Sequence, residues 1–178
     1  MSMAMTEAAK PGTFELIERA AQPTAVIPIE TTPDGIGPAL GQAFAEVQAA
    51  LGRAGVAPVG PPFARYFEHS PARMTLEAGF PVGMPVGGDG RVKPGELPAG
   101  RIVQTWHAGG YDTVAETYGR LEAWIRENGH TPAGPPWEVY LTDPTSQPDP
   151  SRWMTEILWP IRPPWGCMSL HLPGHIKG

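Results

Sequence analysis

Hydrophobic and polar residues recur along this chain in patterns that predict helices and strands in turn. Between Pro38 and Arg53, apolar side chains return every three or four residues, which is the spacing of one helix face. These side chains are Leu40, Phe44, Val47 and Leu51. Pro38 suits the first turn of a helix, and Gly55 suits the position just after its end. The pattern therefore predicts a helix over residues 38–53.

Strand-like segments flank this predicted helix on both sides. Residues 14–30 contain two short apolar runs around a turn at Gln22–Pro23, and Pro28 in the second run favours a sheet edge or a bulge. Residues 56–82 contain two further predicted strands separated by a turn. Glycine and proline recur throughout residues 83–100, which indicates a linker.

The second half of the chain repeats the first. The segment GVAPVGPPFARYF from Gly55 matches GHTPAGPPWEVYL from Gly129, and the offset between them is 74 residues (129 − 55). The same offset aligns the predicted helix with a second helical pattern. Its aligned pairs are Phe44 with Tyr118, Val47 with Leu121, and Leu51 with Ile125. A later strand, EAGFPV, is repeated as EILWPI, so each half predicts a β-α-β-β unit.

Two β-α-β-β units predict an α+β fold, in which a pseudo-twofold antiparallel sheet carries both helices on one face. We expect the repeats at residues 14–82 and 101–161, joined by the linker 83–100, with a flexible N-terminus over 1–13 and a tail over 162–178. The sheet face opposite the helices would then be concave between the two halves. Because ligand pockets form at such interfaces, we expect a central ligand cleft there.

Composition and charge exclude several classes of protein. Hydrophobic residues make up 41% of the 178 residues and charged residues 17%, which is typical of a globular chain. The net charge of -5 gives no basic footprint for nucleic acid. The single cysteine, Cys167, allows no intrachain disulfide. The chain shows neither a signal peptide nor an apolar run of about 18 residues, so we expect a cytoplasmic protein without a membrane partner.

Two glutamates are candidates for chemistry because each lies among apolar and aromatic residues of a predicted strand. Burying an unpaired carboxylate costs several kcal/mol or forces it to take up a proton. Strand alternation places Glu138 and Tyr140 on one face and Trp137 on the other. Glu156 lies in the last strand, and Glu77 is its counterpart in the first half, so we expect two carboxylates to approach one cleft. The expected ligand-binding residues are Glu156, Glu138, Tyr140, Trp137, Glu77, Tyr111 and Trp106.

A carboxylate among aromatic side chains can serve two kinds of function. It can select lipophilic cations, because Coulomb attraction adds to cation–π contacts. Alternatively, burial can raise its pKa towards neutrality, so that it acts as a general acid or base. In that case Glu156 and Tyr140 would be the catalytic residues. The sequence pattern leaves both functions open.

Histidine and cysteine add no clear site. His171 and His175 are four residues apart, but Pro173–Gly174 between them opposes the helix that would align two metal ligands. Cys167 has no evident base beside it, and His107 fits a structural role better than a catalytic one. We therefore expect neither a metal nor a cofactor.

Several segments resemble the GyrI-like small-molecule-binding domain, also called the AraC-type effector-binding domain. They are LPAG before a strand, GGY before the second helix, and the strands GPPWEVY and TEILWPI. With a looser match in the first half, the resemblance covers residues 14–161. It implies a duplicated β-α-β-β fold whose cleft is lined by Glu138 and Glu156. Relatives bind hydrophobic, often cationic, compounds, and a stand-alone branch is similar to hydrolases that open cyclopropanoid alkylating agents with water.

Three functions follow as hypotheses. The first is a stand-alone multidrug-binding protein, monomeric or homodimeric, whose partner is a hydrophobic or aromatic small molecule held by Glu156. The second is a hydrolase of the same fold, and the third is an interaction module whose open groove receives a peptide. The residues before Phe14 are too few for a helix-turn-helix, so we expect no direct contact with nucleic acid.

Overall fold

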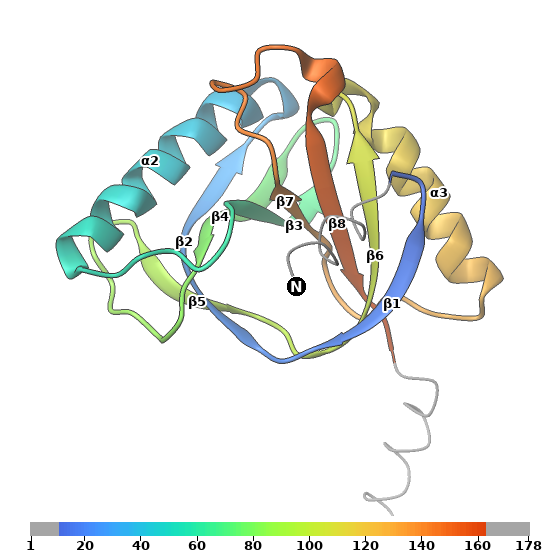
Figure 1. Ribbon diagram of the computed structural model, residues 1–178, viewed down its shortest axis with the longest axis horizontal. Helices are drawn as coiled ribbons and strands as arrows, with labels where there is room; N and C mark the ends of the chain where they lie inside the picture. The colour runs from blue at the N-terminus through green and yellow to red at the C-terminus, as the bar shows by residue number, and fades with distance from the viewer. Residues whose placement is uncertain (1–10, 163–178) are drawn as a thin grey trace, which may run out of the picture.

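Residues 11–162 are described by the computed structural model of this protein (Figure 1). They form eight strands and two α-helices. The strands are β1 (Phe14–Arg19), β2 (Gln22–Thr31), β3 (Phe63–His69), β4 (Met74–Pro81), β5 (Lys93–Leu97), β6 (Gly100–Ala108), β7 (Trp137–Tyr140) and β8 (Met154–Pro160). The helices are α2 (Ile36–Ala54) and α3 (Val114–Glu127). Cys167, His171 and His175 lie outside the described residues, so the expectations about them stay predictions.

The strands form one antiparallel sheet in the order β1-β6-β8-β7-β3-β4-β2-β5. Each strand of the first repeat has a counterpart in the second: β1 and β5, β2 and β6, β3 and β7, β4 and β8. If each strand is replaced by its counterpart, the strand order is the same read from the opposite edge. The symmetry is the pseudo-twofold that the duplication predicts, with β3 and β7 meeting at its centre. The predicted α+β fold class is therefore confirmed.

Each repeat begins with one strand more than the predicted unit. Residues 83–100, expected to be a linker, contain β5, which pairs with Gln22–Val26 of β2. In the same way β1 pairs with β6, so the first strand of each repeat lies beside a strand of the other repeat. The turn between β1 and β2 lies at Ala20–Ala21, just before the predicted Gln22–Pro23. Pro28 lies beyond the part of β2 that pairs with β5, which leaves it at a sheet edge, as predicted.

The helix expected over residues 38–53 is confirmed as α2, which extends slightly further at both ends. Gly55 ends it with a φ of 70°, a left-handed conformation that glycine adopts without steric cost. The backbone N–H of Val56 then donates to the Leu51 carbonyl oxygen at 2.9 Å, which completes the C-terminal cap. Within residues 11–162, neither helix is both long enough and apolar enough to cross a membrane.

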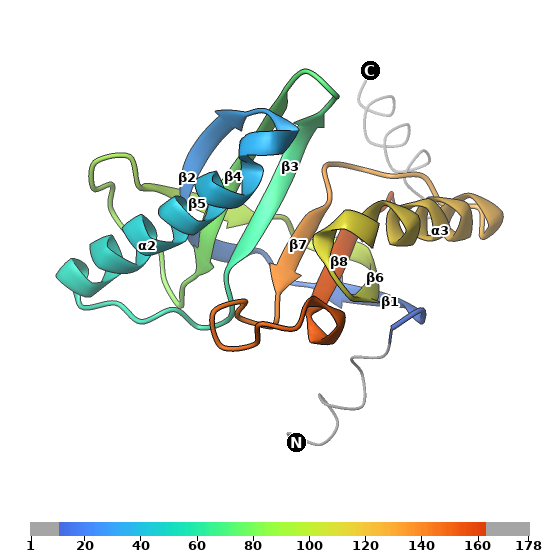
Figure 2. The ribbon, with the colours of Figure 1, turned by 90° about the horizontal axis from the view of Figure 1, so that it is seen from above.

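The two helices cover the outer strands of one sheet face and leave the central strands open. Figure 2 shows β3 and β7 running between α2 and α3. Helix α2 packs on β2 and β4, and α3 packs on β6 and β8, each through its own apolar cluster. The first cluster includes Val47, Ile27 and Leu76, and the second includes Leu121, Val103 and Ile157. This arrangement makes β3 and β7 the floor of a space between the helices.

The face opposite the helices is not a binding cleft, so that expectation is wrong. The sheet curls on this side into a half-barrel (Figure 1). Large apolar side chains from several strands fill the inside of the curl. They are Trp137, Phe63, Leu158, Val26, Leu97 and Ile102. Trp137 is only 1% exposed, because closing the curl removes apolar surface from water that an open face would leave hydrated.

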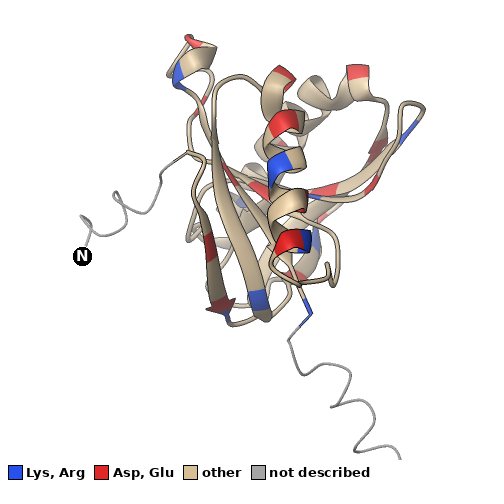
Figure 3. Cartoon of the chain, turned by 90° about the vertical axis from the view of Figure 1, so that its right-hand side faces the viewer, with Lys and Arg blue, Asp and Glu red and all other residues tan. Residues whose placement is uncertain are grey.

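Helix α3 carries charges of both signs. Figure 3 shows acidic and basic residues alternating along it, and neither sign gathers there. They are Glu116, Arg120, Glu122, Arg126 and Glu127. On this face the described chain therefore presents no basic surface of the kind that binds nucleic acid.

Candidate ligand-binding site

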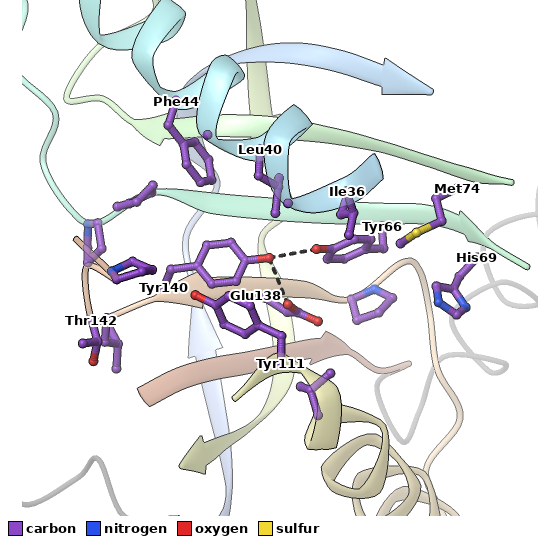
Figure 4. Close-up of a pocket in the computed structure, with 18 of the residues that line it drawn as sticks. Ile36, Leu40, Phe44, Tyr66, His69, Met74, Tyr111, Glu138, Tyr140 and Thr142 are labelled. Atoms are coloured by element: carbon purple, nitrogen blue, oxygen red, sulfur yellow. Dashed lines mark hydrogen bonds between the residues drawn. The ribbon is translucent and has the colours of Figure 1, made fainter. Parts of the chain in front are cut away.

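A cleft of about 1200 Å³ lies between α2 and α3, over the floor formed by β3 and β7 (Figure 4). It exceeds the roughly 300–1,000 Å³ of most small-molecule pockets. Its wall residues include Ile36, Leu40 and Phe44 of α2 and Val114 and Tyr118 of α3, and its floor residues include Tyr66, Glu138 and Tyr140. The cleft is thus an apolar, aromatic space around one deep carboxylate.

The four residues of β7 place Glu138 in the cleft by strand alternation. Trp137 points into the filled side of the sheet, so Glu138 and Tyr140 point to the helix side. The β3 residue opposite Glu138 is Ala64, whose small side chain leaves room on the floor. Glu138 is therefore held at the centre of the sheet, beside the pseudo-twofold axis.

Three tyrosines form a hydrogen-bond network with Glu138. Figure 4 shows two of its bonds, Tyr66–Tyr140 and Tyr140–Glu138. The Tyr118 hydroxyl donates to Glu138 Oε2 at 2.8 Å, and the Tyr140 hydroxyl donates to Oε1 at 2.9 Å. The Tyr66 hydroxyl lies 2.8 Å from that of Tyr140. Because the Tyr140 hydrogen is directed to Glu138, Tyr66 donates to Tyr140. All three hydroxyls are therefore polarised towards the carboxylate.

Burial controls the acid–base properties of this network. Glu138 is 7% exposed, and burial raises the pKa of its carboxyl, while the hydrogen bonds from Tyr118 and Tyr140 act to lower it. Burial, together with the nearby charge of Glu138, raises the pKa values of Tyr66, Tyr118 and Tyr140 well above the ordinary range. The tyrosines therefore stay protonated near neutral pH and remain hydrogen-bond donors.

No ion pair within residues 11–162 includes Glu138. The cleft lining holds three further carboxylates, from Glu68, Glu122 and Asp143, and in the described part of the chain neither lysine nor arginine lines it. No group of three or more metal-ligating side chains occurs in that part either. The charged groups of the cleft are thus suited to a cation.

The model of the family described as the GyrI-like small molecule binding domain matches residues 7–162. The chain belongs to this GyrI-like family. Among curated proteins, none matches the sequence.

Three solved structures have the same fold as this GyrI-like domain. EcmrR, in a complex with DNA, has 21% identity and a TM-score of 0.74 over 90% of this chain and 61% of its own, so the present chain spans about three-fifths of that protein. A hydrolase from Listeria innocua has 15% identity and a TM-score of 0.63, with 90% of this chain and 97% of that chain covered. SAV2435 bound to tetraphenylphosphonium has 12% identity and a TM-score of 0.62, with 84% and 94% covered. At these identities the likeness shows the fold alone.

The GyrI-like domain brings three of the seven expected ligand residues into its cleft: Glu138, Tyr140 and Tyr111. Tyr111 follows β6 in a short turn, and its ring packs against Tyr140, with 5.7 Å between centroids, and against Trp153 at 5.0 Å. It is 41% exposed, which places it at the rim of the cleft.

Glu156, expected to be the central polar residue, lies on the other face of the sheet. In the β7–β8 pairing, Glu156 is opposite Val139, whereas Glu138 is opposite Ile157. Since directly paired residues share a face, the two glutamates point to opposite faces. Glu156 accepts a hydrogen bond from Gln104, and burial raises the pKa of its carboxyl. It does not line the cleft, so the expectation that Glu156 and Glu138 line one cleft is wrong.

Glu77, Trp106 and Trp137 are also absent from the cleft lining. Glu77 pairs with Arg65 across β3 and β4, and burial raises the pKa of its carboxyl while Arg65 lowers it. Trp106 is paired with Glu156 and shares its face. Trp137 fills the inside of the sheet. The cleft was expected on the sheet face opposite the helices. Glu77, Trp106 and Trp137 point to that face, so they were expected in the cleft.

Sequence reasoning missed Tyr66, Tyr118 and Phe44 as cleft residues. The signal was present in the repeat, since Tyr66 is separated from Tyr140 by 74 positions and Phe44 is aligned with Tyr118. Because Tyr140 was expected in a cleft between the two repeats, its counterpart Tyr66 could have been expected in the same cleft.

His107 has the structural role expected for it. It is 5% exposed, with Nδ1 2.7 Å from Thr117 Oγ1 and Nε2 3.0 Å from the Gly110 carbonyl oxygen. These contacts tie the end of β6 to the first turn of α3. His107 therefore anchors the segment that carries Tyr111 to the rim of the cleft.

Proposed function

We propose that this GyrI-like domain binds hydrophobic, aromatic cations in the cleft between α2 and α3, with Glu138 as the counter-charge. One observation carries the proposal: Glu138 is 7% exposed and takes hydrogen bonds from two tyrosines, yet forms no ion pair within residues 11–162. Neutral donors stabilise the anion without cancelling its charge. A bound cation would supply the missing charge.

Electrostatics and aromatic surface act together in such a site. At an effective dielectric constant of about 20, two unit charges about 4 Å apart gain roughly 4 kcal/mol. Aromatic faces add about 0.5–2 kcal/mol for each cation–π contact. Desolvation of the ligand and the protein offsets part of both gains. The broad apolar walls suit several hydrophobic cations, which supports multidrug binding.

Two further points support the proposal. The cleft lining includes four carboxylates, among them Glu138, and within the described residues it has neither lysine nor arginine, with His69 as its one histidine. SAV2435, a protein of the same fold, is bound to tetraphenylphosphonium, which is a hydrophobic aromatic cation.

Calorimetric titration with tetraphenylphosphonium and with tetraphenylborate tests the proposal. The two ions have the same shape and opposite charge, so the protein should bind the first and not the second. Glu138→Gln should weaken binding of the phosphonium by at least about tenfold, because the substitution removes the charge and keeps the shape. Glu156→Gln, the same change outside the cleft, is the matched control. Equal affinity for the two ions, or no effect of Glu138→Gln in a folded protein, would refute the proposal.

A second candidate is hydrolysis of a strained electrophile such as a cyclopropanoid compound. It is favoured by the raised pKa of Glu138, by the Tyr140 hydroxyl at 2.9 Å from that carboxylate, and by the likeness to a hydrolase from Listeria innocua. Glu138 would take a proton from water while the water oxygen bonds to a ring carbon. The strained C–C bond would break, Tyr140 would protonate the atom that receives the electron pair, and Glu138 would return its proton to Tyr140.

Mass spectrometry of the recovered compound separates the two candidates. Incubation with catalytic amounts of protein should yield the compound plus one water, over many turnovers, if the domain is a hydrolase. Loss of this product in Glu138→Gln would assign the general base. Recovery of unchanged compound would leave binding as the function.

A further inference from the structure

The cleft is lined by residue pairs related by the internal repeat. Its axis passes between Ala64 and Glu138, which face each other in the β3–β7 pairing and lie at equivalent positions of the two repeats. Backbone hydrogen bonds repeat across this axis. The Tyr66 N–H donates to the Pro136 carbonyl oxygen at 3.1 Å, and the Tyr140 N–H donates to the Pro62 carbonyl oxygen at 3.0 Å. The floor therefore has two equivalent ends.

The aromatic walls repeat in the same way. Phe44 of α2 packs edge-on against Phe80 of β4, with ring centroids 5.9 Å apart and planes at 69°. Tyr118 of α3 packs edge-on against Trp159 of β8, at 6.0 Å and 75°. These are corresponding positions of the two repeats, and all four side chains line the cleft. Each end of the cleft thus has one edge-on aromatic pair of the same geometry.

We name these two ends by their residues. The first half-site is formed by Phe44, Phe80 and Tyr140, which are in ring contact. The second is defined by their repeat counterparts Tyr118, Trp159 and Tyr66, which also line the cleft. Glu138 belongs to both, because one carboxylate oxygen accepts from Tyr140 and the other from Tyr118. Its repeat counterpart is Ala64, so a single charge lies between two aromatic half-sites.

We propose that the cleft selects ligands in which one central cation carries two aromatic arms, one for each half-site. This inference rests on the proposed function, since it uses Glu138 as the counter-charge. It adds a requirement for the shape of the ligand. A cation with one arm fills one half-site and leaves apolar surface of the other in water.

The rims of the two half-sites differ, because one aromatic residue of the cleft has no aromatic counterpart in the other repeat. Tyr111 covers the first half-site, with its ring 5.7 Å from that of Tyr140. The corresponding residue of the other repeat is Gly37, which also lines the cleft, and a Cβ placed there meets nothing within 4 Å. The second half-site therefore lacks the aromatic cover that Tyr111 gives to the first, and position 37 has space for a larger side chain.

Two quaternary ammonium ions test the inference by calorimetry: benzyltrimethylammonium, with one arm, and dibenzyldimethylammonium, with two. In the wild-type protein the second benzyl group should strengthen binding by about tenfold or more, because a second ring leaves water. Gly37→Tyr should place a ring in the second half-site. It should abolish this gain, because the second arm then has no free half-site.

The matched control is Gly52→Tyr. Gly52 lies on the same helix, outside the cleft lining, and a Cβ there also meets nothing within 4 Å. This variant should keep the full gain from the second arm. Equal affinity of the wild type for both ions, or a gain that survives Gly37→Tyr, would overturn the inference while leaving cation binding intact. If neither ion binds and tetraphenylphosphonium also fails to bind, the proposed function fails together with the inference.

Discussion

The hydroxyl of Tyr118 offers the sharpest test of how the cleft keeps Glu138 charged. It donates to Glu138 Oε2 at 2.8 Å, and its ring lines the cleft against Trp159. Tyr118→Phe removes the hydroxyl and retains the ring. A hydrogen bond to a charged group contributes about 1.5–3 kcal/mol, so the anion should lose about that much relative to the protonated carboxyl.

This loss should appear as a shift in the pH dependence of cation binding. Burial already raises the pKa of Glu138, and binding needs the ionised form, so affinity should rise with pH through this pKa and then level off. Without the Tyr118 hydroxyl the midpoint should move to higher pH, by about one pH unit for each 1.4 kcal/mol lost. The plateau at high pH should change less, because there the carboxylate is ionised in both proteins.

Calorimetric titration of tetraphenylphosphonium from about pH 4 to about pH 9 would measure this shift. Tyr111→Phe is the matched control, since Tyr111 lines the same cleft and its hydroxyl makes no hydrogen bond to Glu138. An unchanged midpoint in Tyr118→Phe, or an equal shift in Tyr111→Phe, would refute the role assigned to the Tyr118 hydroxyl.

Two other predictions concern the network and the sheet. Tyr66→Phe removes a hydroxyl that contacts Tyr140 and not the carboxylate, so the loss of cation affinity should stay near 1 kcal/mol, below that of Tyr118→Phe; a larger loss in the same titration would contradict the order of donors in the network. Trp137→Ala should lower the free energy of unfolding by about 3–5 kcal/mol, because a side chain only 1% exposed leaves a cavity inside the curled sheet. Urea denaturation would measure it, and a loss below about 1 kcal/mol would show that the curl does not depend on this residue.

Part of the candidate site could be read from the sequence because it depends on local geometry. Alternation in WEVY puts Glu138 and Tyr140 on the same side of β7, and the structure keeps them together in the cleft. The register of β7 with β8, by contrast, depends on pairing across a loop of 13 residues, 141–153. A shift of one residue in that register would have reversed the face of Glu156. The two glutamates could therefore not be assigned to one cleft from their separate strands.

The amino-acid sequence by itself determined the duplication, the α2 helix and the antiparallel α+β class. Each of these follows from residue spacing within a segment or from comparing one segment with its copy. Only the tertiary structure decided which sheet face holds the ligand cleft. The sheet curls around Trp137 and fills one face, while helices lying over the outer strands leave β3 and β7 uncovered on the other. That choice depends on how much apolar surface each face can bury once all eight strands are assembled, and no single segment contains this information.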